Sequence, residues 1–257
     1  MLDAWSPAQY LKFEDHRTRP AIDLLARVGN EHPTNVTDLG CGPGNSTELL
    51  VARYGSGPVT GMDTSVNMIE AAKKRLPDCI FYEADAATWS PAKPQDVIFA
   101  NAVLQWLPDH EALFVRLARH LKPGGTLAVQ MPDNLDEPSH VSMRMAAADP
   151  RWAEKLAKAH GERTTILPAN QYWSILKSQS SHVDIWRTTY HHPLRGLNGI
   201  VEWFKSTGLL PYLSRLNADE QIAYLERYEE LLREHYPVLS DGTVILAFPR
   251  IFLIAVR

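Results

Sequence analysis

The sequence lacks the features of a secreted, membrane-spanning or nucleic-acid-binding protein. It has two cysteines, Cys41 and Cys79, in unlike contexts, which excludes a disulfide framework and favours a reducing, cytoplasmic compartment. With 26 Lys and Arg residues against 30 Asp and Glu residues, it is not the strongly basic chain expected of a nucleic-acid partner. No apolar run reaches the roughly 18 residues of a membrane span, and we expect neither a signal peptide nor a membrane partner.

The composition is that of a globular protein of moderate size. Of the 257 residues, 45% are hydrophobic and 22% are charged, which is close to the average for such proteins. A chain of this length buries about 70–75% of its unfolded surface, so one large domain, or one domain with an insertion, is expected. No Cys/His spacing indicates a zinc site, and the adjacent pair His191 and His192 is expected in solvent.

Residues 19–131 alternate between helical and strand patterns. The apolar runs and turn signals predict strands near 36–39, 58–62, 80–82, 96–100 and 126–130. Helices are expected between them, near 45–53, 66–76 and 109–121, after a first helix that begins with Pro20 in its first turn. Such alternation predicts an α/β fold with a doubly wound, mostly parallel sheet.

The pattern changes after residue 132. Residues 138–178 and 195–236 are mainly helical in pattern, whereas 182–190, 244–248 and 250–256 resemble strands. We therefore expect a seven-stranded sheet with a helical cap inserted after the fifth strand. The predicted parts are an N-terminal helical lid (1–30), a core (31–134), a cap (135–181 and 195–240) and strands that complete the sheet (182–194 and 241–257).

The sharpest motif is Asp-Leu-Gly-Cys-Gly-Pro-Gly, from Asp38 to Gly44. Its glycines alternate between a predicted strand and a helix start, where they allow a tight turn and let a ligand lie against the backbone. In a doubly wound sheet such a ligand lies at the carboxyl end of the first strand. A dinucleotide-binding loop would have the spacing Gly-x-Gly-x-x-Gly, and Asp38 would repel a pyrophosphate.

Two further carboxylates end the next two predicted strands. Asp63 follows Gly44 by 19 residues and can accept from a ribose diol, while Asp85 can accept from an exocyclic amine. Asp38 suits an ammonium group, so successive strand ends offer acceptors for ammonium, ribose and adenine. That set describes S-adenosylmethionine better than NAD. Each carboxylate alone could equally cap a helix or lie in a solvated turn.

Residues 36–131 resemble the class I S-adenosylmethionine-dependent methyltransferases. The resemblance rests on the glycine loop, Asp63, Asp85, the segment 101–106 and the Leu-Lys-Pro-Gly-Gly run at 121–125. It implies a Rossmann-like fold, S-adenosylmethionine as cofactor with S-adenosylhomocysteine as product, and no metal. It directs the segment after the fourth strand toward the methyl group, and it leaves Met68 either on the adenine or in the helix core. The implied cofactor-binding residues are Tyr10, Asp38, Gly40, Cys41, Gly42, Gly44, Asp63, Thr64, Met68, Asp85, Ala86, Asn101, Gln105 and Trp106.

The flanking segments bear on the methyl acceptor. The stretch 138–215 has ten Lys and Arg residues against five Asp and Glu residues, in a chain of net charge −4. If this stretch covers the methyl group, its potential predicts a small anionic substrate; a solvated basic face is the alternative. Asn101 and Gln105 cannot deprotonate a substrate, whereas a carboxylate is ionised at pH 7 and needs no base. Histidines in the cap could still serve as bases for other acceptors.

The whole chain also resembles the bacterial trans-aconitate 2-methyltransferases. The matching segments are 10–20, 40–48, 102–107, 130–134 and 248–252, although 102–106 also occurs in malonyl-carrier-protein methyltransferases. The resemblance implies a monomethyl ester of trans-aconitate, formed by in-line attack of a carboxylate on the methyl carbon. Catalysis would come from positioning, without a general base, while basic side chains hold the non-reacting carboxylates. The candidate substrate-binding residues are Arg17, Arg144, His182, Tyr190, Arg195, Trp203 and Arg250.

Other functions stay open at this point. Another anionic acceptor is one alternative, either a malonyl-carrier protein, which would need an exposed basic docking surface, or a small phenol. A non-catalytic module that binds S-adenosylmethionine is a second, and an NAD-dependent oxidoreductase fits the glycine loop least. The sequence does not decide which carboxylate is methylated, which arginines face the pocket, or the oligomeric state.

Overall fold

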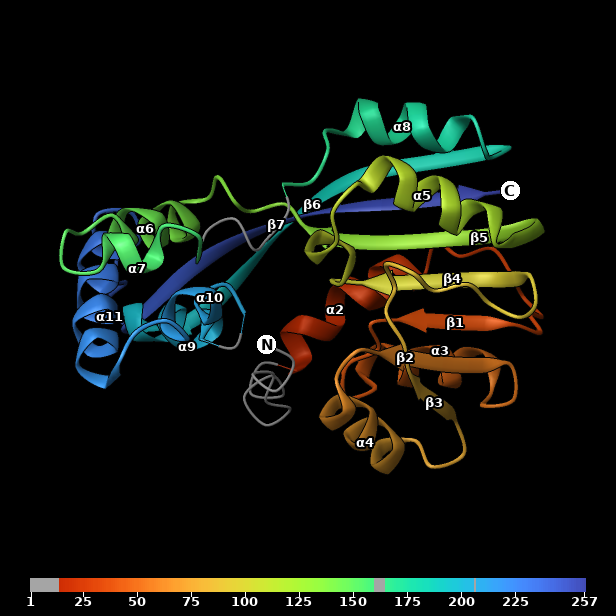
Figure 1. Cartoon of the computed structure of the whole chain (residues 1–257), viewed down its shortest axis with the longest axis horizontal. Helices are drawn as coiled ribbons and strands as arrows, with labels where there is room; N and C mark the ends of the chain where they lie inside the picture. The colour runs from red at the N-terminus through yellow and green to blue at the C-terminus, as the bar shows by residue number, and fades with distance from the viewer. Residues whose placement is uncertain (1–13, 160–164, 206) are drawn as a thin grey trace. The chain divides into compact units, whose positions relative to one another are not determined.

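The structure is built on one seven-stranded sheet (Figure 1). This computed structural model describes residues 14–159, 165–205 and 207–257, without the side chains of residues 14, 15 and 17. The strands are β1 (Val36–Leu39), β2 (Val59–Asp63), β3 (Ile80–Glu83), β4 (Gln95–Asn101), β5 (Leu121–Pro132), β6 (His182–Arg195) and β7 (Thr243–Val256). The helices are α2 (Glu14–Leu25), α3 (Asn45–Tyr54), α4 (Val66–Arg75), α5 (His110–Arg119), α6 (Pro138–Ala147), α7 (Ala153–Leu156), α8 (Ala169–Lys177), α9 (Gly196–Phe204), α10 (Leu210–Leu213) and α11 (Ala218–Arg233), with a short 3-10 turn η2 (Leu104–Trp106).

The strand order is β3-β2-β1-β4-β5-β7-β6. The pairings from β3 to β5 are parallel. β7 runs against β5, because Gly125 pairs with Arg257 at one end and Asp133 with Pro249 at the other. The expected doubly wound, mostly parallel sheet is therefore confirmed. Strand order reverses between β1 and β4, and in such sheets ligands bind in the crevice at the carboxyl ends of these strands.

Both faces of the sheet are buried. Residues Val97 to Ala100 of β4 are all 0% exposed, although successive side chains of a strand point to opposite faces. Ile98 and Ala100 belong to a core cluster that includes Phe114 of α5 and residues of α8. Val97 and Phe99 are therefore covered from the other side of the sheet. α2 packs on α3 and on β5.

Several helices begin after a capping residue. Ser65 precedes α4, and its Oγ accepts the backbone N–H of Met68 at 3.4 Å. Asp109 caps α5 by accepting a backbone N–H of the first turn at 3.1 Å. Asn217 and Glu220 form a capping box at the start of α11. These bonds satisfy N–H groups that have no partner within the helix itself.

Two boundaries expected at prolines are wrong. α2 begins at Glu14, so Pro20 lies inside the helix, where the buried residues Ala21 and Leu24 hold this helix in place. β7 continues through Pro249 as one strand. Pro249 lies level with the end of β5, and its carbonyl accepts the N–H of Asp133 at 2.9 Å. In both places tertiary packing outweighs the local effect of a proline, which lacks an N–H donor.

The chain divides into two compact units. The first comprises the chain up to Pro132, Ile166–Thr188 and Ile251–Arg257, and the second comprises Asp133–Thr165 and Thr189–Arg250. α8 clusters with the first unit because it packs against α5, whereas its sequence position suggests the cap. In the second unit, α11 packs against α6 and α9. Strands β6 and β7 have residues in both units.

The charge of the second unit differs from that of the basic stretch in the sequence. This unit contains eleven Lys and Arg residues against fourteen Asp and Glu residues, a net charge of −3. The stretch 138–215 extends into the first unit and omits the acidic helix α11. Some of its cations lie in surface ion pairs, as Arg151 does with Asp149 at 2.8 Å. Support for an anionic substrate must therefore come from individual cations.

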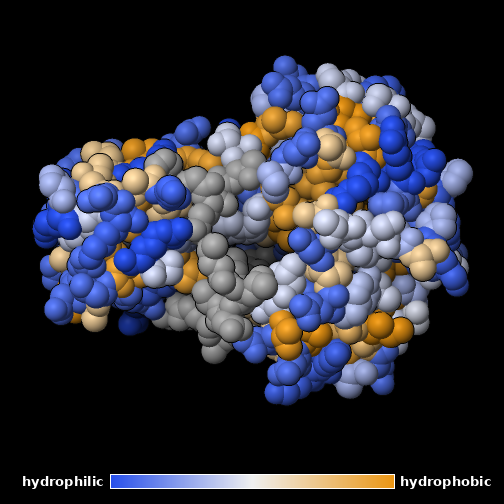
Figure 2. All heavy atoms as spheres, viewed as in Figure 1, coloured by the Kyte–Doolittle hydropathy of each residue, from blue (hydrophilic) through white to orange (hydrophobic). Residues whose placement is uncertain are grey.

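Within residues 14–159, 165–205 and 207–257, no helix combines the length and the apolar character of a membrane span. Figure 2 shows hydrophilic residues over much of the visible face, with hydrophobic atoms in separate groups. The large exposed apolar side chains come from different elements, among them Val66 of α4, Ile80 of β3 and Ile222 of α11.

Candidate active site

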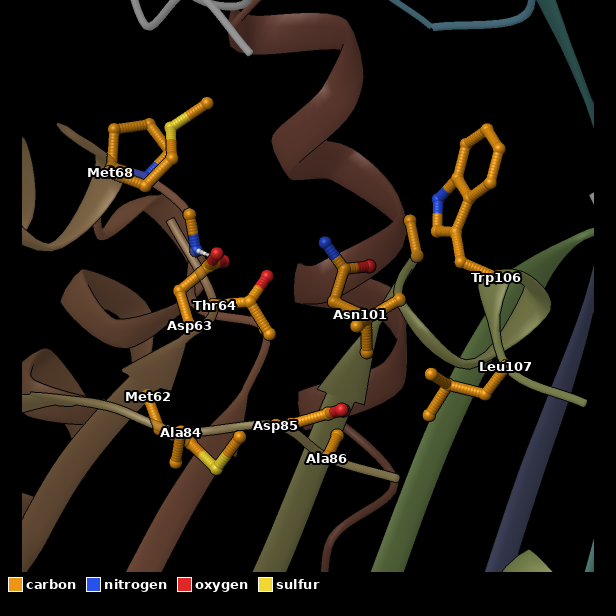
Figure 3. A pocket seen from close by; sticks show the side chains of 15 residues that line it. Met62, Asp63, Thr64, Met68, Ala84, Asp85, Ala86, Asn101, Trp106 and Leu107 are labelled. Carbon is orange, nitrogen blue, oxygen red and sulfur yellow. Dashed lines mark hydrogen bonds between the residues drawn. The ribbon is translucent and has the colours of Figure 1, made fainter. Parts of the chain in front are cut away.

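A hollow opens at the carboxyl ends of the strands in the first unit (Figure 3). Its cavity volume is about 200 Å³, and the space including its open mouth is about 850 Å³. In Figure 3, Asp63 and Thr64 lie on one side, Trp106 and Leu107 on the other, and Asp85 and Ala86 on the floor. The lining residues are Gly40, Gly42, Pro43, Met62, Asp63, Thr64, Met68, Ala84, Asp85, Ala86, Asn101, Ala102, Val103, Trp106 and Leu107.

The glycine loop between β1 and α3 forms one wall. Gly40 has a φ of 62°, and a Cβ atom built there would lie 2.3 Å from Cγ2 of Val103. Only glycine therefore lets this loop approach the segment after β4. Gly44 has a different role, because it does not line the hollow and its backbone lies against Ala72 of α4. The last glycine of the motif serves the packing of α3 against α4.

Asp63 combines a structural bond with a position in the hollow. Its Oδ2 accepts the N–H of Gly42 at 3.0 Å, and its Oδ1 accepts the N–H of Ser65 at 2.9 Å. Burial raises the pKa of this carboxyl, and these backbone N–H groups oppose the rise. A carboxylate oxygen can accept more than one hydrogen bond. Asp63 can therefore hold the glycine loop and still accept from a ligand hydroxyl.

Asp38 lies behind the loop rather than among the lining residues. It is 0% exposed, and its Oδ2 accepts the hydroxyls of Ser46 and Thr47, both at 2.7 Å. Its Oδ1 has no hydrogen-bond partner among the described residues. Burial raises the pKa of Asp38 to about 7, helped by the charge of Asp63 and opposed by the two hydroxyls. Asp38 is thus a buried acceptor with one oxygen unsatisfied.

The floor of the hollow is formed by residues after β3, and Met68 of α4 lies on the side of Asp63. Asp85 is exposed, and its Oδ1 accepts the N–H of Ala87 at 2.8 Å. Ala86 is 4% exposed, and Met68 is 4% exposed while also lining the hollow. Met68 therefore belongs both to the helix core and to the wall. An acceptor beside flat apolar surface is a suitable arrangement for a purine ring.

The segment after β4 closes the opposite side. Ala102 has a φ of 56°, a region that side chains other than glycine rarely adopt. Asn101 lines the hollow, and its Oδ1 is buried without a partner among the described residues. Trp106 also lines the hollow, whereas Gln105 does not; its Nε2 donates to the carbonyl of Ala102 at 2.7 Å. Backbone strain of this kind is common at functional sites.

A second, smaller hollow adjoins the glycine loop. It is lined by Gly40, Cys41, Gly42 and Asn101 together with residues of α2 and α3. The residues around both hollows that the sequence did not predict are Thr18, Ala21, Pro43, Asn45, Ser46, Met62, Ala84, Ala102, Val103 and Leu107. Most of them adjoin a predicted residue in the chain, so widening each strand-end motif by two positions would have found them.

Three expected substrate-binding residues lie together in the second unit around His192. His192 is 1% exposed, which corrects the expectation that it lies in solvent. Its ring stacks on Trp203 at 4.4 Å and on Tyr190 at 6.3 Å between ring centroids. The guanidinium of Arg250 lies 4.6 Å from the ring centroid of Phe248, which contacts His192 at 5.9 Å. Arg250 is itself only 4% exposed, which is rare for a cation.

The other expected substrate-binding residues do not join this cluster through any recorded contact. Arg144 is half-buried in the second unit, and its guanidinium donates to the carbonyl of Leu135 at 2.8 Å. Arg195 is exposed just before α9, and His182 is exposed at the start of β6, in the first unit. Tyr10 and the side chain of Arg17 lie outside the described residues.

The chemistry available at the main hollow is that of binding and orientation. It offers two carboxylates at its surface, one carboxylate behind the loop, the amide of Asn101 and an indole. The described residues contain no group of three or more His, Cys, Asp or Glu placed to hold a metal ion. Both cysteines are buried, and neither forms a disulfide. This arrangement suits an uncharged purine nucleoside with a cationic tail.

Comparisons with known proteins agree with this arrangement. Residues 36–125 match a family described as a methyltransferase domain. The trans-aconitate 2-methyltransferase of Methylobacterium nodulans is 56% identical over 253 residues, with 98% of each chain covered. The enzyme of the same name from Rhizobium etli is 52% identical over 254 residues, with 99% of each chain covered. The similarity includes both compact units.

Solved structures show the same fold at low sequence identity. The YcgJ protein from Bacillus subtilis has a TM-score of 0.59 at 13% identity, covering 95% of this chain and 98% of its own. A phosphoethanolamine N-methyltransferase of Haemonchus contortus has a TM-score of 0.55 at 17% identity, covering 92% and 52%. That structure contains S-adenosylhomocysteine. At such identities the likeness establishes the fold alone.

Proposed function

Because the chain belongs to the trans-aconitate 2-methyltransferase family, we propose that it transfers the methyl group of S-adenosylmethionine to a carboxylate of trans-aconitate. The product would be a monomethyl ester. The observation that carries this proposal is the hollow at the carboxyl ends of the strands, where a glycine loop and strand-end carboxylates line one common space. The identity to curated relatives over nearly the full chain supports the choice of acceptor.

The residues of the hollow fit S-adenosylmethionine. Asp63 would accept the ribose hydroxyls while it keeps its bonds to the loop. Asp85 would accept from the adenine amine, with Met68 against the ring. The charge of Asp38, whose Oδ1 has no partner among the described residues, would attract the ammonium group from behind the loop. When bound, S-adenosylmethionine supplies the electrophilic methyl group.

The anion-binding part of the proposal rests on one buried cation. Arg250 is 4% exposed and belongs to the aromatic cluster of the second unit with Tyr190, His192, Trp203 and Phe248. A guanidinium can hold a carboxylate through two parallel hydrogen bonds. We assign Arg250 to a non-reacting carboxylate of trans-aconitate. Arg17, Arg144, Arg195 and His182 remain candidates for the others.

The reaction needs positioning more than acid–base chemistry. An ionised carboxylate attacks the methyl carbon, and the sulfonium leaves as a thioether, so no proton is transferred. Holding two reactants in a near-attack geometry can supply about 7–11 kcal/mol. The nucleophilic oxygen must stay free of strong donors, which suits the apolar and amide groups of Trp106 and Asn101. Basic side chains would then act only on the carboxylates that do not react.

The proposal also concerns partners and compartment. A small anionic acceptor is expected, and neither a nucleic acid nor a membrane is. Two buried cysteines without a disulfide are compatible with a reducing cytoplasm. Cys79 donates to the carbonyl of Val59 at 3.2 Å, so it has a structural role.

The test is methyl transfer from radiolabelled S-adenosylmethionine. Trans-aconitate, cis-aconitate, citrate, isocitrate and malonyl-carrier protein serve as parallel acceptors. A base-labile methyl ester formed preferentially on trans-aconitate is the expected result. Preferential transfer to another acceptor would overturn the substrate. Intact cofactor binding with no transfer to any acceptor would overturn the enzymatic role and favour a binding module.

A further inference from the structure

A chain of hydrogen bonds lies behind the wall of the hollow that carries Trp106. His110, the first residue of α5, has its Nε2 atom 2.9 Å from the carbonyl of Leu104, where η2 begins. Its Nδ1 atom lies 2.5 Å from the hydroxyl of Tyr172 in α8. That hydroxyl also accepts the backbone N–H of Leu167 at 3.2 Å. All five residues belong to the first unit.

The partners fix the direction of each bond. A carbonyl can only accept, so Nε2 of His110 carries the proton and donates to Leu104. Nδ1 then has a lone pair and accepts from the Tyr172 hydroxyl, whose oxygen accepts from Leu167. Burial lowers the pKa of His110, so the neutral ring that this pattern requires is the prevailing form at pH 7. Every donor in the chain therefore has an acceptor.

The chain of hydrogen bonds reaches η2 at Leu104, the first residue of that turn. The carbonyl of Leu104 also accepts the N–H of Leu107 at 3.0 Å, so His110 reinforces the bond that closes the turn. Trp106 and Leu107 both line the hollow. Ala102, just before the turn, has the strained φ of 56°. A strained backbone persists only where its surroundings hold it.

The two side chains of this hydrogen-bonded chain are buried and closely packed. His110 is 4% exposed and Tyr172 is 0% exposed. Phe114 packs on both, with ring centroids 5.6 Å from His110 and 4.9 Å from Tyr172. Leu167 lies two residues beyond Thr165, at which a segment of the second unit ends. The Tyr172 hydroxyl therefore connects η2, through His110, with Leu167, near which the polypeptide re-enters the first unit.

We propose that His110 and Tyr172 are positioning residues that hold η2, and with it Trp106, in the geometry required for methyl transfer. They touch neither the hollow nor its contents, since neither lines it. The proposal rests on the proposed function, because it concerns the rate of that transfer. Its structural part, the position of Trp106, can be measured without an acceptor.

The first variant is Tyr172→Phe, which removes only the hydroxyl. We expect kcat to fall at least tenfold, with KM for trans-aconitate and Kd for S-adenosylhomocysteine within threefold of the parent. Tyr82→Phe is the matched control, because it removes a tyrosine hydroxyl that accepts from the indole of Trp89 at 3.0 Å in the same unit. It should lower the melting temperature without lowering kcat.

The second measurement is independent of turnover. The protein is labelled with 5-fluorotryptophan, and the 19F resonance of Trp106 is assigned among seven tryptophans by its loss in Trp106→Phe. With S-adenosylhomocysteine bound, this resonance should shift or broaden in Tyr172→Phe and stay unchanged in Tyr82→Phe. If the parent methylates no acceptor, the proposed function fails while this resonance still tests the position of the turn.

A pair of variants at His110 keeps the proposal testable if Tyr172→Phe does not fold. His110→Gln retains a donor for the carbonyl of Leu104, whereas His110→Leu removes it. His110→Gln should keep most of the parent's kcat and a Trp106 resonance close to that of the parent. His110→Leu should lose both. Equal kcat and an unchanged resonance in Tyr172→Phe, His110→Leu and the parent would show that the chain only stabilises the fold.

Discussion

At the residue scale, Asp63 joins the glycine loop to the ligand space. Its two oxygens accept N–H groups from the loop and from the start of α4. Asp63→Ala removes both bonds and the ribose acceptor, so we expect Kd for S-adenosylmethionine to rise at least tenfold in isothermal calorimetry. Asp149→Ala, which breaks a surface ion pair of the second unit, should leave Kd unchanged. An unchanged Kd in Asp63→Ala would remove this residue from the cofactor site.

The buried carboxyl of Asp38 makes both stability and cofactor affinity depend on pH. Its pKa of about 7 is above the unfolded value of 3.8, so the folded state holds a proton that the unfolded state loses, and stability falls as pH rises between these values. Asp38→Asn keeps an acceptor for Ser46 and Thr47 but has no charge. We therefore expect a higher melting temperature than the parent at pH 8, with little difference at pH 4.

Affinity should change in the opposite direction. The ammonium of S-adenosylmethionine favours ionised Asp38, so affinity should rise with pH through about 7 in the parent and lose this dependence in Asp38→Asn. Calorimetry at pH 6 and pH 8 measures both. A parent affinity that is equal at the two values would show that Asp38 does not interact with the ligand.

Arg250 tests the acceptor side of the proposal. Arg250→Gln keeps hydrogen-bond donors but removes the charge, so KM for trans-aconitate should rise at least tenfold. Kd for S-adenosylmethionine should remain within twofold, because the cofactor residues lie in the first unit. Arg227→Gln is a suitable control, since Arg227 pairs with Glu230 on the surface at 2.9 Å. Equal losses of both affinities would point to a folding role for Arg250.

At the element scale, the loop after β1 fits against the segment after β4. Gly40→Ala would put a Cβ atom 2.3 Å from Val103 at a φ of 62°, and we expect a loss of about 2–4 kcal/mol in stability from clash and backbone strain. Val103→Ala removes the Cγ atoms at 2.3 and 3.3 Å but keeps the Cβ atom at 2.7 Å. It should therefore return part of the steric cost, and the double variant should be more stable than additivity predicts by at least about 0.5 kcal/mol. Urea denaturation of the four proteins measures this coupling. Strict additivity would mean that the two segments do not contact.

The strands and helices that surround the glycine loop were predictable because their signals are local. β1 has the expected bounds, and Ser65, Asp109 and Asn217 cap the helices that follow them. The boundaries expected at Pro20 and Pro249 were wrong because a proline affects only the backbone next to it. Burial of the whole helix or strand decides whether that element continues past the proline. The same contrast between local signals and distant packing applies to the site. Asp63 ends β2 and Asp85 lies two residues beyond β3, but the position of Asp38 behind the loop depends on the hydroxyls of α3.

At the scale of the whole molecule, residues distant in sequence decide what a local window cannot show. α8 joins the first unit by packing on α5, and α11 brings enough acids to give the second unit a net charge of −3. No local pattern in the sequence shows that His192 is buried, because His192 and its exposed neighbour His191 are the same residue type. Substrate recognition must therefore be located by burial of single side chains such as Arg250.

The division into two units predicts that local damage stays local. Asn217→Ala removes the cap of α11 and should cost about 1 kcal/mol, so hydrogen exchange should accelerate in α11 and in α6, on which it packs. Exchange in β1 to β4 should not change, nor should Kd for S-adenosylhomocysteine. Ser65→Ala, which removes the cap of α4, is the matched control. In this variant hydrogen exchange should accelerate in the first unit and stay unchanged in α6 and α11.

The bound cofactor should act on the first unit alone. A ligand stabilises the state that binds it, so S-adenosylhomocysteine should slow exchange in residues 40–44, 63–65 and 101–107, which surround the hollow. Protection that also reaches α11 in the parent, together with faster exchange in both units of Asn217→Ala, would mean that the strands shared by the two units make them unfold as one. If instead each effect stays within one unit, residues of the second unit can change acceptor specificity without loss of cofactor binding in the first.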